Sequence, residues 1–148
     1  MQTTRAATLT IDEVGLESVD VIREINRACF DEERIINTFE RDGLRMLLAR
    51  CNGQAVGFKI GYRENRFNFY SAKGGVAPDH RRSGIARLLL DRMEDLTREE
   101  GYRYFCFDTF PNLHPGMTVL GLASGYRVTR ADFNATYRDF RLRFEKRL

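Results

Sequence analysis

The stretch from Gly74 to Leu90, GGVAPDHRRSGIARLLL, constrains the fold of this chain more than any other. The end of an apolar strand is followed by a proline-containing turn, a basic loop with a glycine, and the start of an amphipathic helix. Free backbone N–H groups in such a loop and at a helix start form a cradle for phosphates. Gly84 permits a close approach of the backbone to a ligand, and the small side chain of Ala86 leaves room for the ligand at the first helical turn. This segment therefore predicts a pyrophosphate site between a strand and a helix.

Three arginines, Arg81, Arg82 and Arg87, add positive charge around this loop. Basic side chains at a helix start oppose the helix dipole, so a bound anion accounts for them better than the alternative, a basic helix terminus without a ligand. Neither the Gly-x-Gly-x-x-Gly pattern of dinucleotide-binding folds nor the P-loop pattern that ends in Gly-Lys-Ser/Thr occurs in the chain. The loop therefore belongs to another class of phosphate site.

The length of 148 residues, with 43% hydrophobic and 30% charged residues, predicts one domain over residues 1–148 with a sizeable core. The net charge of +3 comes from arginines spread along the chain, so we expect no nucleic-acid partner. The three cysteines share no short spacing, which favours reduced thiols and a cytoplasmic location, and we expect no metal site. No apolar run reaches the length of a membrane span, and the N-terminus lacks the apolar core of a signal peptide.

Hydrophobic periodicity and turn signals predict the order of the elements. We expect strands over residues 8–11, 44–50, 54–62, 67–76, 102–109, 126–132 and 137–146, and helices over residues 16–30, 31–41, 85–100 and 116–124. This order predicts an α/β fold, with a mixed sheet of six or seven strands and helices on both faces. The phosphate loop then lies at the carboxyl end of a strand, where open α/β sheets bind ligands.

The pattern Arg81-x-x-Gly84-x-Ala86, preceded by Val76-x-Pro78, resembles the acyl-CoA pyrophosphate loop of the GNAT (GCN5-related N-acetyltransferase) superfamily. The predicted order of elements is similar to the GNAT fold over nearly the whole chain. The resemblance implies an enzyme that uses acetyl-CoA. Such an enzyme transfers the acetyl group directly to a primary amine, on a peptide N-terminus, a lysine or a small molecule.

Three further segments are similar to one bacterial GNAT subgroup: GFKIGY at 57–62, FYSAKGGVAP at 69–78 and EKRL at 145–148. The resemblance implies that CoA is bound by Gly75, Val76, Ala77, Arg81, Arg82, Ser83, Gly84, Ile85, Ala86 and Asn112. Backbone N–H groups around Gly75 and Val76 would hydrogen-bond the thioester carbonyl. The pair Gly74-Gly75 supports this, because glycines in a strand mark a bulge or a close backbone approach, although a simple strand bend is the alternative.

The customary proton-transfer groups of the family are both missing from their places. Many relatives carry a glutamate on the strand before Val-x-Pro, where this chain has Asn68 to Ser71 and no carboxylate. The family's tyrosine aligns with Gly121. The remaining catalytic candidates are Tyr70, Ser71, Asp108 and His114. Core packing is the alternative role for Tyr70, capping of a turn for Asp108, and a solvated loop position for His114.

Four acidic residues follow the first predicted helix: Asp31, Glu32, Glu33 and Glu40. Their side chains would suit the edge of a binding site for a cationic acceptor, and a solvent-exposed helix face is the alternative. Because the customary acid and base are missing, a non-catalytic acyl-CoA-binding regulatory module is the competing function. A nucleic-acid-binding protein is disfavoured, since the arginines alternate with apolar residues as the wet face of a sheet requires. The exposed faces of the last hairpin leave room for a homodimer through sheet edges.

Overall fold

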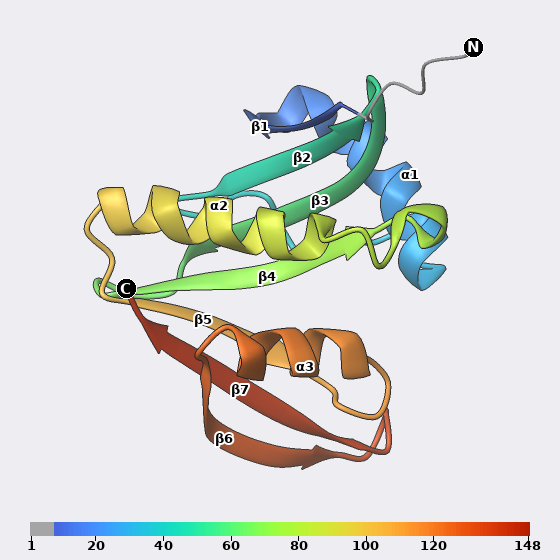
Figure 1. The fold of residues 1–148 in the computed structure, drawn as a ribbon. Helices are drawn as coiled ribbons and strands as arrows, with labels where there is room; N and C mark the ends of the chain where they lie inside the picture. Colours follow the sequence, from blue (N-terminus) through green and yellow to red (C-terminus); the bar gives the residue numbers. More distant parts are fainter. Residues whose placement is uncertain (1–7) are drawn as a thin grey trace.

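A computed structural model describes residues 8–148, which form a seven-stranded sheet with helices on both faces (Figure 1). The strands are β1 (Leu9–Val14), β2 (Arg45–Cys51), β3 (Gln54–Arg63), β4 (Asn68–Val76), β5 (Tyr104–Thr109), β6 (Arg127–Asn134) and β7 (Asp139–Arg147). The helices are α1 (Val19–Phe30), α2 (Ile85–Glu99) and α3 (Pro115–Ala123), with short 3-10 turns η1 (Leu16–Ser18) and η2 (Pro78–His80). The expectations about a leader peptide and the first residues of the domain concern residues 1–7, which lie outside the described residues.

The strand order in space is β1-β2-β3-β4-β5-β7-β6, and β4 and β5 pair in parallel while the other neighbouring pairs are antiparallel. Strand β7 therefore lies between β5 and β6, although β6 precedes it in the chain. The number of strands and the mixed pairing confirm the predicted α/β sheet. Within the described residues, no helix is both long and apolar enough to span a membrane.

Alternating apolar side chains fill one core layer on each face of the sheet. Helix α1 covers the first layer, where Ile22 packs with Phe58. Helices α2 and α3 cover the second layer, where Leu90 of α2 belongs to one cluster with Phe105 and Phe144 (Figure 1). This arrangement confirms the prediction of helices on both faces.

The helix predicted over residues 31–41 is wrong, because this segment is irregular. Asp31 adopts a left-handed conformation with φ of 54° and ends α1. The buried Asn26 side chain then donates hydrogen bonds to the backbone carbonyls of Glu32 (2.8 Å) and Arg34 (3.3 Å). These bonds hold the start of the segment in an irregular path that its acidic, helix-like sequence does not reveal.

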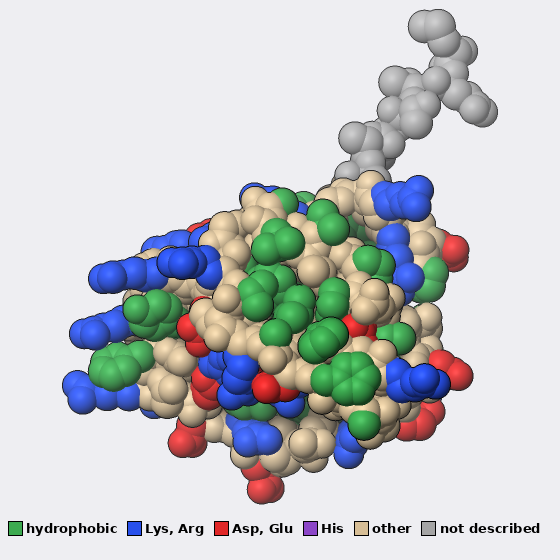
Figure 2. All heavy atoms as spheres, turned by 90° about the horizontal axis from the view of Figure 1, so that it is seen from below, with side chains coloured by type: hydrophobic (Ala, Val, Ile, Leu, Met, Phe, Trp, Pro, Cys, Tyr) green, Lys and Arg blue, Asp and Glu red, His purple; other side chains and the backbone are tan. Residues whose placement is uncertain are grey.

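The other predicted elements have the expected type, with ends displaced by a few residues, and residues 16–18 form η1 rather than helix. Strand β6 forms one edge of the sheet. Figure 2 shows apolar side chains gathered on the face where α3, β6 and β7 lie. The exposed large apolar residues of these three elements are Val119, Leu122, Val128, Phe133 and Phe140. Pairing of this open edge with a second copy stays a prediction.

The second core layer contains a buried group of charged and polar side chains around Glu94 of α2. Tyr126 Oη donates a 2.9 Å hydrogen bond to Glu94 Oε1, and Lys146 Nζ donates one of 2.9 Å to Oε2. Lys59 of β3 is also buried, with 6% of its surface exposed. Burial lowers the pKa of Lys59 to about 8, and the negative charge of Glu94 opposes this change only in part. A buried ammonium in this position destabilises the fold at neutral pH.

We expect Lys59→Met to raise the free energy of unfolding by about 3 kcal/mol at pH 7 and by about half as much at pH 9.5. The folded state binds fewer protons than the unfolded state between pH 8 and the ordinary lysine pKa of 10.5, so wild-type stability rises with pH across this window. Burial also raises the pKa of Cys106 to about 12, so both proteins lose stability at high pH. This loss is the same in the wild type and the variant, so it cancels in the difference between their free energies of unfolding. Denaturant unfolding of both proteins at the two pH values measures this effect, and a difference that does not change with pH would contradict it.

Candidate active site

Strands β4 and β5 separate in the middle of the sheet. They pair only over Asn68–Ser71 and Tyr104–Phe107, although β4 continues to Val76 and β5 to Thr109 (Figure 1). A bulge at Ala72 lies where the separation starts, because Ile60 pairs with Lys73 while Gly61 pairs with Ser71. Bulges bend a strand and re-aim its side chains. The backbone of β4 beyond Ser71 thus has no strand partner on its β5 side and is free to bind a ligand.

Both glycines of β4 permit close packing of the strand. A Cβ on Gly75 would lie 3.0 Å from Cys29 Sγ and 3.2 Å from Phe30 Cε2, both in the last turn of α1. A Cβ on Gly74 would lie 3.2 Å from the backbone oxygen of Phe58. The glycines thus allow α1 and β3 to pack closely against β4, the bulge lies two residues before the glycine pair, and the approach of a thioester to this backbone stays a prediction.

The loop between β4 and α2 presents a row of unpaired backbone donors. The N–H groups of residues 82–87 make no hydrogen bond with any acceptor in the described chain. Arg82 and Gly84 have φ of 63° and 82°, and these left-handed conformations turn successive N–H groups toward one side, as in anion-binding nests. Gly84 is also the N-cap of α2, so the positive end of the helix dipole adds to the site.

The structure brings nine predicted CoA-binding residues into one continuous segment. They are Gly75, Val76, Ala77, Arg81, Arg82, Ser83, Gly84, Ile85 and Ala86. Arg81 Nε donates to the Val76 carbonyl at 3.0 Å, and Cys29 Sγ donates to the same oxygen at 3.2 Å. Ile85 is buried under the first turn of α2. Arg81 and Ile85 therefore stabilise the loop, while Arg82 and Ser83 are exposed beside its free N–H groups.

Two predicted residues of the β5–α3 loop lie apart from this segment. Asn112 Nδ2 donates to Asp139 Oδ1 at 2.7 Å, and the Asn112 backbone N–H donates to Oδ2 at 2.8 Å. The Asn112 side chain thus ties the loop to the start of β7. His114 occupies the N-cap position of α3, and its ring meets Phe30 edge-on with centroids 5.8 Å apart. In residues 8–148, His114 makes no side-chain hydrogen bond to another catalytic candidate.

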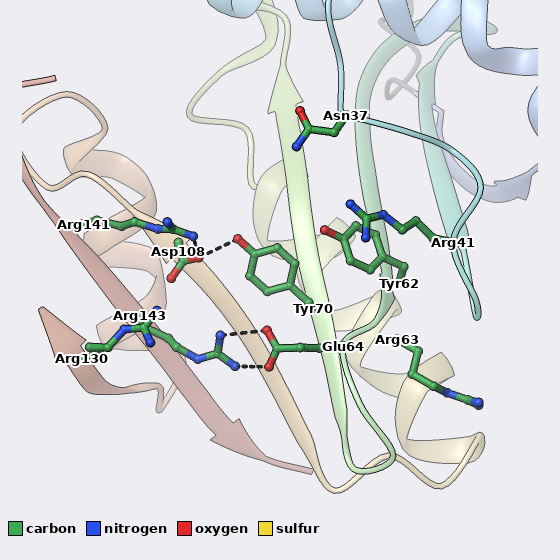
Figure 3. Close-up of a pocket in the computed structure, with 10 residues that line it drawn as sticks. All are labelled: Asn37, Arg41, Tyr62, Arg63, Glu64, Tyr70, Asp108, Arg130, Arg141 and Arg143. Carbon is green, nitrogen blue, oxygen red and sulfur yellow. Dashed lines mark hydrogen bonds and ion pairs between the residues drawn. The ribbon is translucent and has the colours of Figure 1, made fainter. Parts of the chain in front are cut away.

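Tyr70 and Asp108 meet at the point where β4 and β5 separate (Figure 3). Tyr70 Oη donates a 2.6 Å hydrogen bond to Asp108 Oδ2, and Arg141 Nη2 of β7 donates to the same oxygen at 2.7 Å. The Asp108 side chain is 9% exposed, and its other oxygen, Oδ1, is buried without a partner in the described chain. Burial, and then the bond to Asp108, raises the pKa of Tyr70 above its usual value, so the phenol stays protonated at neutral pH.

The remaining catalytic candidate, Ser71, is buried and adjoins Tyr70 on β4. Side chains alternate along a strand, so Ser71 points to the opposite face of the sheet from Tyr70. Arg141 was not among the residues predicted to form the site. Its alternation with Phe140 and Leu142 indicated only a solvent-exposed face of the strand, and nothing in the sequence indicated its contact with Asp108.

Tyr70 and Asp108 line a cavity of about 480 Å³ (Figure 3). Its other lining residues are Asn37, Arg41, Tyr62, Arg63, Glu64, Arg130, Arg141 and Arg143. They come from the irregular segment before β2, the end of β3, and the β6–β7 hairpin. The acidic residues Asp31, Glu32, Glu33 and Glu40 do not line it. Glu32 instead pairs with Lys73 at 2.7 Å and Glu33 with Arg27, so these residues form no rim of this cavity, and their role toward an acceptor stays a prediction.

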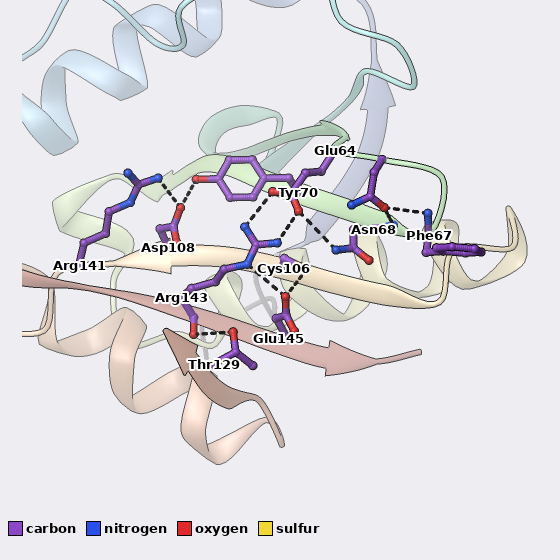
Figure 4. A network of polar contacts seen from close by, with 11 residues as sticks. Glu64, Phe67, Asn68, Tyr70, Cys106, Asp108, Thr129, Arg141, Arg143 and Glu145 are labelled. Atoms are coloured by element: carbon purple, nitrogen blue, oxygen red, sulfur yellow. Dashed lines mark hydrogen bonds and ion pairs between the residues drawn. The ribbon is translucent and has the colours of Figure 1, made fainter. Parts of the chain in front are cut away.

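A second network of polar contacts, seen in Figure 4, holds Glu64 and Arg143 in place at the same cavity. Arg143 donates two hydrogen bonds from its terminal nitrogens to the Glu64 carboxylate, and its Nε donates to Glu145 Oε1 at 3.1 Å. The bond to Arg143 holds the pKa of Glu64 below its usual value. Glu64 and Arg143 therefore neutralise one another. Residues 8–148 contain no group of three His, Cys, Asp or Glu side chains arranged to hold a metal ion.

Comparison with solved structures finds the same fold in several acetyltransferases. The ribosomal-protein-S18-alanine N-acetyltransferase from Escherichia coli superimposes with a TM-score of 0.83 at 15% identity, over 95% of this chain and 94% of the other. An IAA acetyltransferase from Bacillus cereus gives a TM-score of 0.82 at 17% identity, over 95% and 100% of the two chains. A putative acetyltransferase, yncA, from Salmonella typhimurium was solved with its cofactor acetyl-CoA. It gives a TM-score of 0.75 at 19% identity, over 95% and 94%.

These identities establish the fold, and family membership rests on the sequence. No curated protein matches the chain. Residues 13–113 match the model of the acetyltransferase (GNAT) domain. This match spans more than half of the chain and includes the phosphate loop, β4, β5 and Asp108. The chain thus belongs to the GNAT family of acetyltransferases, for which acetyl-CoA is the co-substrate.

Proposed function

We propose that this chain is an N-acetyltransferase that moves an acetyl group from acetyl-CoA directly to a primary amine. One observation carries the proposal: the phosphate-binding loop and a buried carboxylate with a free oxygen, Asp108, flank the place where β4 and β5 separate. The loop follows the end of β4, and Asp108 lies near the end of β5. A thioester held along β4 would thus have a proton acceptor on the facing strand.

The cofactor would be held mainly by backbone groups. The free N–H groups of residues 82–87 suit the pyrophosphate, with Arg82 adding charge beside them. The unpaired side of β4 beyond Ser71 suits the pantetheine arm, and its N–H groups near Gly75 and Val76 would polarise the thioester carbonyl. Asn112 is bound to Asp139, so it would act on the cofactor only by positioning the β5–α3 loop.

Transfer requires a neutral amine, a new bond from nitrogen to the acetyl carbon, and cleavage of the carbon–sulfur bond. Attack makes the nitrogen far more acidic, so the Asp108 carboxylate, which lines the cavity, would take its proton as the bond forms, directly or through an ordered water. The departing sulfur takes up the proton that Asp108 received, which gives the CoA thiol and restores the carboxylate. Arg141 and Tyr70 both donate hydrogen bonds to Asp108 Oδ2 and so fix the orientation of the carboxylate.

A non-catalytic acyl-CoA-binding module is the less favoured alternative. It drew support from the missing glutamate on β4 and the missing tyrosine at Gly121. Asp108 supplies a carboxylate from the neighbouring strand, which weakens that argument. We also propose a cytoplasmic location, because Cys29, Cys51 and Cys106 are all unpaired, as is usual in reducing compartments.

We expect Arg82→Glu to weaken acetyl-CoA binding by about tenfold or more, because it places a negative charge beside the pyrophosphate site. Isothermal titration of the purified protein with acetyl-CoA measures the change. Arg92→Glu is the matched control, since Arg92 is exposed in the middle of α2 and undergoes the same change of charge. Equal acetyl-CoA affinities of the two variants would show that the loop is not part of the binding site. Absence of binding in the wild-type protein would overturn the proposed function.

A further inference from the structure

We propose that the acceptor is a small amine that also carries an oxyanion, a carboxylate or a phosphate, and that Arg41 binds this oxyanion. The inference rests on the proposed N-acetyltransferase function and names its substrate class. It comes from the charges around the 480 Å³ cavity that contains Asp108. A cavity of this size is typical of sites for small molecules.

Five arginines and two carboxylates line the cavity, and most of these charges are already paired. Arg143 is neutralised by Glu64, and Arg141 by Asp108. Arg130 pairs with Asp132 at 3.1 Å. Arg63 points away from the cavity (Figure 3), where its Nε donates to Tyr102 Oη at 3.2 Å.

Arg41 is the exception among these arginines. Its guanidinium lies 4.6 Å from the centre of the Tyr62 ring and pairs with no carboxylate in residues 8–148. A guanidinium that lies over an aromatic ring keeps the N–H donors at its edge, in the guanidinium plane, free to bind an oxyanion with two hydrogen bonds. The cavity thus contains one positive charge that is available to a ligand.

The cavity also connects this charge to the proposed reaction centre. Tyr62 lies under Arg41, its ring centre is 5.7 Å from that of Tyr70, and Tyr70 is bonded to Asp108 (Figure 3). A small acceptor in this cavity would place its amine beside the Asp108 carboxylate and its oxyanion at Arg41. A diamine would place a second positive charge beside the unpaired Arg41 guanidinium, which repels it.

The test compares the release of CoA thiol from acetyl-CoA for matched amines with chains of two to five carbons. Each chain length is tested with a terminal carboxylate, a terminal hydroxyl or a second amine, and 2-aminoethyl phosphate is compared with ethanolamine. Wild-type protein, Arg41→Gln and the control Arg103→Gln are used. Arg103 lies over Phe67 at the same 4.6 Å, at the other end of β5, so the control removes an equivalent stacked guanidinium. In parallel, inorganic phosphate is titrated into the CoA-saturated protein, and the Arg41 side-chain N–H signal is followed by NMR.

We expect the wild-type kcat/KM to be about tenfold or more higher for an anionic amine than for its hydroxyl partner. Arg41→Gln should lose this preference, and Arg103→Gln should keep it. The carboxylate and phosphate arms identify the oxyanion. Equal or better use of the hydroxyl amines or diamines would overturn the inference and leave the proposed function standing. If acetyl-CoA binds but no amine reacts, the phosphate titration tests whether Arg41 binds an oxyanion. A shift of the Arg41 N–H signal would support the inference, and an unshifted signal would overturn it. Failure to bind acetyl-CoA would instead overturn the proposed function.

Discussion

Asp108→Asn is expected to lower kcat by roughly 10²- to 10⁴-fold and to leave the fold intact. The asparagine oxygen can keep the two hydrogen bonds that Tyr70 and Arg141 donate to Asp108 Oδ2. The amide NH₂ group then replaces Oδ1, the buried oxygen that has no partner in the described chain. The variant thus exchanges the free proton acceptor for a donor with almost no change in shape.

Steady-state release of CoA thiol measures kcat, and thermal unfolding followed by circular dichroism checks that the variant is folded. Asp95→Asn is the control, because Asp95 is an exposed carboxylate on α2 that pairs with Arg98. A folded Asp108→Asn protein with kcat close to that of the wild type would show that Asp108 only positions its neighbours. Unchanged acetyl-CoA affinity in the same variant would assign the loss to the chemical step.

Gly121→Tyr, which would place a tyrosine where the family resemblance expects one, should destabilise the protein by about 2–3 kcal/mol and restore no activity. A Cβ at Gly121 would lie 2.9 Å from Cζ of Phe107 and 3.4 Å from Cδ1 of Phe144, and both rings are buried. Helix α3 packs closely against β5 and β7 through this glycine. The tyrosine is therefore absent for a reason of packing.

Thermal unfolding measures this effect, and a loss of that size lowers the Tm of a domain of this length by roughly 8–12 °C. Gly116→Tyr is the matched control in the same helix, since a Cβ there meets nothing within 4 Å. We expect the control to unfold near the wild-type temperature. A Gly121→Tyr protein that is as stable as the control and has a higher kcat would mean that α3 can move to accept the side chain.

The conformation of the loop before α2 could be predicted from the sequence because it depends on neighbouring residues. Gly84 adopts the left-handed conformation that its position before α2 required, and the N–H groups of residues 82–87 are free as expected. The alternation and periodicity of apolar residues likewise predicted the strands and the three helices. Residues 31–41 were mispredicted because the side chain of Asn26, in the preceding helix, decides their path.

The amino-acid sequence by itself determined the α/β sheet, the GNAT-like loop and the position of Asp108 at a strand end, since each of these follows from local patterns. Tertiary structure alone decided the surroundings of Asp108. Strand β7 inserts between β5 and β6 and brings Arg141 to this carboxylate, and the irregular segment before β2 brings Arg41 to the same cavity. These residues are far apart in the chain, and their charges acquire a role only when the sheet order and the turn after α1 place them around one cavity.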